Sequence, residues 1–168
     1  MKNFVLFVLA GLLCCLSITV LAEAQSQKMT PEKCVELTHW LEKNPLDENA
    51  RSVGAILLKY ISDTPDFTVS LYSEFLGELL KSKKPGTDEL TGQYMFGMAA
   101  FCCQHPDKKN NEEAKQMAGV QSMIRTYGML KAQNPEIKIR FMEKLLKLQK
   151  RGKLESFVKK QTLKCTGK

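Results

Sequence analysis

Residues 87–104 read TDELTGQYMFGMAAFCCQ, and this stretch decides the fold. As a helix it would carry apolar side chains on nearly every side, interrupted by Gly92 and Gly97. A helix with so little polar surface is usually central and buried. Because Thr87-Asp88-Glu89 suits a helix start, the pattern predicts a buried helix over 88–104. Its two glycines would let neighbouring helices approach closely.

On both sides of this stretch, apolar residues recur three and four positions apart, as in amphipathic helices. The pattern predicts further helices over about 31–43, 48–62, 69–81, 112–132, 135–150 and 154–161. The predicted fold class is therefore all-α, an antiparallel array of six to seven helices forming one domain over residues 25–168. Tetratricopeptide-like packing is compatible with this pattern, although no clear repeat recurs at the period of about 34 residues typical of those proteins.

The first 24 residues, MKNFVLFVLAGLLCCLSITVLAEA, have the three parts of a secretory signal peptide. Lys2 precedes an apolar run, and Ala22-Glu23-Ala24 is a small-x-small cleavage site. Cleavage after Ala24 would give a secreted or periplasmic protein. The alternative is an uncleaved membrane anchor, because the apolar run approaches the ~20 residues that cross a bilayer. Only if this segment is uncleaved would we expect the membrane as a partner.

Four cysteines follow the leader: Cys34, Cys102, Cys103 and Cys165. An even number of cysteines in an oxidising compartment favours disulfides. A bridge between the neighbours Cys102 and Cys103 would distort the backbone, so the favoured pairings join Cys34 and Cys165 separately to that pair. Both ends of the chain would then be tied to the central helix. One bridge with two free thiols is an alternative, and a metal site that includes His105 lacks the expected CxxC spacing.

Charge is distributed unevenly along the chain. Residues 25–104 hold 8 Lys or Arg and 11 Asp or Glu, whereas residues 105–168 hold 16 Lys or Arg and 6 Asp or Glu. A basic half can attract an acidic protein, an anionic surface or nucleic acid, or it can simply be a solvated face. We do not expect nucleic acid as a partner, because the protein is expected to be exported and aromatic residues do not alternate with the basic ones.

The predicted helix over 135–150 separates its apolar side from its basic side. Its apolar arc consists of Ile137, Phe141, Met142, Leu145, Leu146 and Leu148. The opposite side forms a candidate binding face, which we call the basic face: Arg140, Lys144, Lys147, Lys150 and Arg151. Basic amphipathic helices can bind membrane surfaces. The alternative is a core helix with a basic solvent side, because the arc is wide enough to pack against two neighbours.

No pattern of residues indicates catalysis or a cofactor. The only histidines are His39 and His105, and the sequence contains neither a glycine-rich phosphate loop nor a zinc-protease motif. The acidic pairs lie at predicted helix starts, where the helix dipole explains them. We therefore assign no catalytic, cofactor-binding or metal-binding residues and expect no cofactor.

Two sequence segments resemble segments of a group of known proteins. One is the turn over 63–69, DTPDFTV, and the other is LLKLQKRGKLESFV over 145–158. With the helices placed, the chain is similar to small secreted all-helical proteins of Gram-negative bacteria, a group with no assigned activity. The resemblance implies a secreted or periplasmic helical domain and implies nothing about the cysteine pairs.

These observations favour an exported, non-enzymatic binding or structural protein. The expected partner is an acidic protein or an anionic surface. The first alternative is a carrier of a small apolar ligand in a cavity lined by methionine and aromatic side chains, for example beside Met95 and Met98. The second is an enzyme with an unrecognised carboxylate site.

Overall fold

The structure is a computed structural model of the chain and describes residues 29–167, so the predicted signal peptide lies outside the described residues. Within residues 29–167 the chain is helical without strands, which confirms the all-α prediction. The elements are α2 (Pro31–Lys43), α3 (Ala50–Asp63), α4 (Ser73–Leu80), α5 (Thr87–Gln104), the short 3-10 helix η2 (Pro106–Lys108), α6 (Glu112–Gln133), α7 (Arg140–Lys150) and α8 (Leu154–Thr166).

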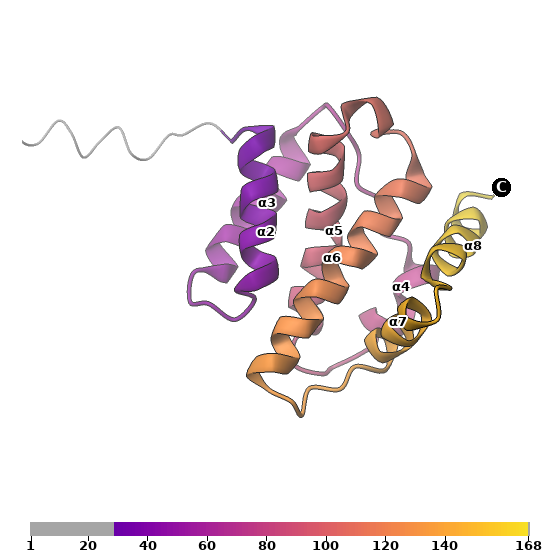
Figure 1. The fold of residues 1–168 in the computed structure, drawn as a ribbon. Coiled ribbons are helices and arrows are strands. Elements are labelled where there is room, and N and C mark those ends of the chain that lie inside the picture. The colour runs from indigo at the N-terminus through magenta and orange to yellow at the C-terminus, as the bar shows by residue number, and fades with distance from the viewer. Residues whose placement is uncertain (1–28, 168) are drawn as a thin grey trace, which may run out of the picture.

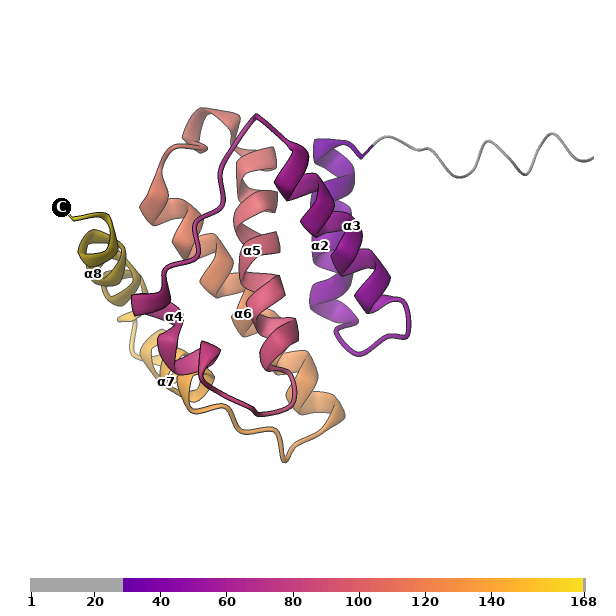
Figure 2. The same cartoon turned by 180° about the vertical axis from the view of Figure 1, so that it is seen from behind.

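Helices α5 and α6 form the centre of the array (Figure 1). The α2–α3 hairpin packs on one side of this pair, and α4, α7 and α8 pack on the other. The view from behind shows the extended α3–α4 connection running along the central pair between these two groups (Figure 2). The two ends of the described chain therefore lie on opposite sides of α5 and α6.

Helix α5 is buried almost all round because it separates two apolar clusters. Tyr94 and Met98 belong to the larger cluster, which α5 forms with α4, α6, α7 and α8. Phe96 and Ala99 belong to the smaller cluster, which α5 forms with α2 and α3. A helix that lies between two cores needs apolar residues on opposite sides, which explains the composition of residues 87–104.

Two glycines allow α5 and α6 to pack closely. A Cβ atom at Gly97 would lie 2.5 Å from the Cβ of Ser122, and one at Gly119 would lie 2.7 Å from the backbone oxygen of Tyr94. The predicted role of Gly97 in close packing is therefore confirmed. The same prediction for Gly92 was wrong, because an added Cβ there would meet only the ring of Phe96 in the same helix.

The predicted helix starts at 69 and 135 were also wrong. Residues 64–72 are not helical, and after a bend at 65–66 the carbonyls of Thr68 and Ser70 accept hydrogen bonds from the side chains of Lys115 and Gln116 on α6, at 3.0 and 3.1 Å. Helix α7 starts at Arg140, and the residues before it run from a turn into extended chain with Ile137 and Ile139 buried. In both segments tertiary contacts replace the helical hydrogen bonds that local sequence favours.

Candidate binding surfaces

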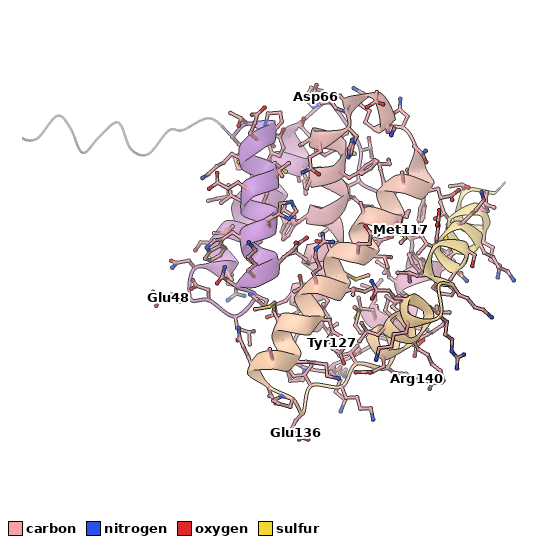
Figure 3. The ribbon with its side chains drawn as sticks, viewed as in Figure 1. Glu48, Asp66, Met117, Tyr127, Glu136 and Arg140 are labelled. Carbon is pink, nitrogen blue, oxygen red and sulfur yellow. The ribbon has the colours of Figure 1, made fainter. Side chains whose placement is uncertain are left out.

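The structure places the whole basic face on the outside of the molecule. All five of its residues are exposed, whereas Phe141, Met142 and Leu145 on the other side of α7 are buried in the larger apolar cluster. Arg140 lies at the margin formed by α7, and Glu48 of the α2–α3 connection lies at the opposite margin (Figure 3). The basic face is therefore well separated from the α2–α3 hairpin.

A buried tyrosine fixes α7 against α6. The hydroxyl of Tyr127 accepts a hydrogen bond from the backbone N–H of Ile139 at 3.2 Å and donates one to Glu143 at 2.7 Å. Lys131 also pairs with Glu143, at 2.9 Å. These two partners hold the pKa of Glu143 below its ordinary value, so the one carboxylate within α7 stays ionised and engaged with α6.

Most of the cations on the basic face lack a nearby carboxylate. Arg140 pairs with Glu78 of α4 at 3.3 Å, and the ammonium of Lys144 lies 4.8 Å from the centre of the Phe157 ring. Apart from Arg140, the residues of the basic face form no ion pair within residues 29–167: Lys144, Lys147, Lys150 and Arg151. Exposed, unpaired cations of this kind create a positive potential that extends beyond the surface.

A cleft of about 650 Å³ lies on the other side of the molecule, between the end of α2, helix α3 and the first half of α5. Its floor includes Leu41, Gly54 and Phe96, and its rim includes exposed Leu46 and Leu58. Sequence reasoning missed this cleft, because its walls come from three separate segments, each of which resembles an ordinary helix surface.

Beside the cleft, a buried carboxylate ties α2 to α6. Glu42 is 5% exposed and accepts hydrogen bonds from the hydroxyl of Ser122 and from two nitrogens of Arg125, at 2.8 and 2.6 Å. Nδ1 of His39 lies 3.1 Å from Oε2 of Glu42, the oxygen that also accepts from Nε of Arg125. Burial alone would raise the pKa of Glu42, but these hydrogen bonds outweigh burial and hold it below the ordinary value. No pattern in the sequence indicates that this glutamate is buried.

All four cysteines of the described chain are free thiols, so the expected disulfides are not formed in this structure. Cys34 of α2 and Cys103 of α5 belong to the same apolar cluster, but they do not lie at disulfide distance. Interaction between the two thiols, together with burial, raises the pKa of Cys34, and the same interaction lowers the pKa of Cys103. Burial raises the pKa of Cys102 to about 11, and Cys165 lies beside Phe75 on the far side of α5.

The remaining candidate groups do not converge on a reactive site. His39 is bound to Glu42, and His105 stacks on Phe101 with ring centres 4.8 Å apart. Among residues 29–167 no three His, Cys, Asp or Glu side chains are arranged to hold a metal ion. Met98 is fully buried within the larger cluster, and Met95 packs in the smaller one, so neither lines the cleft.

Comparison with known proteins finds no match: no family description, no curated protein and no solved structure resembles the chain significantly. No helix in the described part of the chain has both the length and the apolar character needed to span a bilayer.

Proposed function

We propose that this chain is an exported, non-enzymatic binding protein that holds a negatively charged partner on its basic face. The observation that carries the proposal is the exposure of five cations on α7 and the turn after it, four of them without an ion pair among the described residues. Nearby α8 adds three more exposed lysines: Lys159, Lys160 and Lys164. Extended anionic surfaces match such a distribution of charge better than a single small anion does.

The packing of α7 determines how such a partner would be held. Insertion of α7 into a lipid bilayer would require its apolar side to be free, but that side is buried in the larger cluster. Binding would therefore be peripheral and electrostatic, and salt should weaken it by screening the charges. A partner of this kind needs no catalytic group in the protein.

Neutralising the basic face should weaken binding to vesicles that contain anionic phospholipid. Each cation near such a surface contributes about 1 kcal/mol, so the triple variant Lys147→Gln, Lys150→Gln and Arg151→Gln should lose at least about tenfold in affinity at low ionic strength. Vesicle sedimentation measures the bound fraction, with neutral vesicles as the background.

The control variant removes the same charge elsewhere: Lys43→Gln, Lys59→Gln and Lys108→Gln, all exposed and located on α2, α3 and η2. It should keep most of the wild-type affinity. An equal loss in both triple variants would mean that net charge, rather than the basic face, governs binding.

The disulfide and export proposals can be tested together. We expect one bridge, between Cys34 and Cys103, because both side chains belong to the same apolar cluster and the lowered pKa of Cys103 favours its thiolate. The two sulfurs would have to move closer, because they are not at disulfide distance in this structure. The two thiols would give up two electrons and two protons to an oxidising disulfide of the export compartment. The intact mass of the exported protein should correspond to a chain that starts at Gln25 and lacks two hydrogens.

Non-reducing peptide mapping should then recover Cys34 linked to Cys103, with Cys102 and Cys165 as free thiols. An exported chain that retains Met1 would contradict cleavage. Four free thiols in the exported protein, or a bridge that includes Cys165, would contradict the proposed pair.

The carrier alternative receives support from the cleft rather than from the expected methionine-lined cavity. The cleft is lined by one aromatic ring and no methionine. Its volume is within the range of small-molecule sites, about 300–1,000 Å³. The lining of the cleft therefore differs from the cavity lined by methionine and aromatic side chains that the sequence predicts.

A further inference from the structure

The floor of the cleft is open because small residues surround one aromatic ring. Gly54 of α3 and Gly92 of α5 both face Phe96, and a Cβ at either would lie 3.3–3.7 Å from its ring. Ala50 and Ala55 continue the wall along α3. With no larger side chains in these four positions, the ring edge and the adjoining aliphatic groups form an apolar floor that is accessible from solvent.

A buried amide also faces this cleft. Gln93 is 2% exposed and belongs to the lining. Its Nε2 donates to the carbonyl oxygen of Thr38 at 3.2 Å and to the hydroxyl of Ser122 at 2.9 Å, which fixes the orientation of the amide. Its Oε1 accepts no hydrogen bond from any residue in 29–167 and is not sealed off from solvent. This unpaired oxygen can therefore accept a hydrogen bond from a donor group of a ligand in the cleft.

The rim of the cleft is acidic. Asp47 of the α2–α3 connection and Asp88 and Glu89 of α5 line it, against a single cation, Arg51. Asp88 and Glu89 form no ion pair with other described residues. This rim would repel an anion, whereas a cation would be attracted by the rim carboxylates.

We propose that the cleft binds a small cationic amphiphile, that is, an apolar body that ends in a protonated amine. The body lies on the floor over Phe96 and Gly54. The ammonium group donates to Oε1 of Gln93 and faces the carboxylates of Asp88 and Glu89. This site is separate from the basic face, and it has the opposite charge preference.

Three probes with the same chain and different ends test the proposal: octylammonium, octan-1-ol and octanoate. Titration into the purified protein, followed by NMR of backbone amides, should shift the signals of Gly54 and Gly92 and leave those of Gly128 and Gly152 unchanged. Octylammonium should bind at least about tenfold more tightly than octanoate, which is the effect of about 1.4 kcal/mol of differential interaction. Octan-1-ol should lie between them.

Two variants locate the site. Ala55→Trp places a large ring over the cleft from an exposed position and should abolish the shifts, whereas Ile56→Trp, on an exposed position of α3 outside the cleft, should not. The pair Asp88→Asn and Glu89→Gln should reduce octylammonium binding several-fold and leave octan-1-ol binding unchanged. Equal affinities for the three probes, absent shifts at Gly54 and Gly92, or unchanged binding in Ala55→Trp would each overturn the proposal. None of these results bears on the basic face.

Discussion

Replacing Gly119 with alanine should lower the free energy of unfolding by about 3 kcal/mol, the upper part of the range for overpacked cores. The new Cβ would lie 2.7 Å from the backbone oxygen of Tyr94 and 2.8 Å from its ring. Neither can give way easily, because Tyr94 is fully buried and its carbonyl belongs to the middle of α5. Helices α5 and α6 would have to separate, which loosens both apolar clusters.

The matched control is Gly128→Ala in the same helix. No atom lies within 4 Å of a Cβ added there, so this change should stabilise the protein by up to about 1 kcal/mol through helix propensity. Denaturant unfolding followed by circular dichroism measures both variants. Changes of the same sign and size at the two positions would contradict the close packing of α5 and α6.

Replacing Glu42 with alanine should cost about 3 kcal/mol, because it removes one partner of a buried charged network. The hydroxyl of Ser122 would lose its acceptor inside the protein. Arg125 is half exposed and can return to water, which keeps the loss at the lower end of the range for such pairs. The control is Glu36→Ala, also on α2, whose exposed pair with Lys33 should contribute at most about 0.5 kcal/mol.

The same carboxylate should make stability depend on pH. The pKa of Glu42 is lower in the folded protein than its ordinary value of 4.5, so its contribution is present above that value and is lost as the pH falls through the folded pKa. The wild type should therefore lose stability on acidification below about pH 4.5, and Glu42→Ala should lose less over the same interval. Parallel stability profiles for the two proteins would show that Glu42 is not held ionised by the fold.

The fold class could be predicted because α5 is apolar on opposite sides and the other helices show clear periodicity. The start of α2 at Pro31 agrees with the predicted start, and Thr30 caps the helix by accepting a hydrogen bond from the N–H of Lys33 at 3.2 Å. The starts of α4 and α7 could not be predicted from the sequence. Lys115, Gln116 and Tyr127 of α6 bind the backbone before those helices, and nothing local in the sequence shows where a distant side chain will bind.

The candidate surfaces also differ in whether the sequence alone can predict them. A stripe of cations along one helix can be read from periodicity, and all five residues of the basic face lie where that stripe predicts, on the outside. The cleft depends on how α2, α3 and α5 meet, and two glycines that look like interruptions of helices form part of its floor. Glu42 resembled a surface residue, because its burial results from the packing of α2 against α6.

The dependence of binding on ionic strength tests the proposed function most directly. The measurement is the dissociation constant of the purified protein for anionic phospholipid vesicles over a series of salt concentrations. If the basic face holds the partner, affinity should be highest at low salt and fall steeply as the Debye length shortens to about 8 Å at physiological ionic strength. The variant without Lys147, Lys150 and Arg151 charges should show a shallower dependence. Absence of binding at low salt, or an affinity that salt does not change, would contradict the proposal.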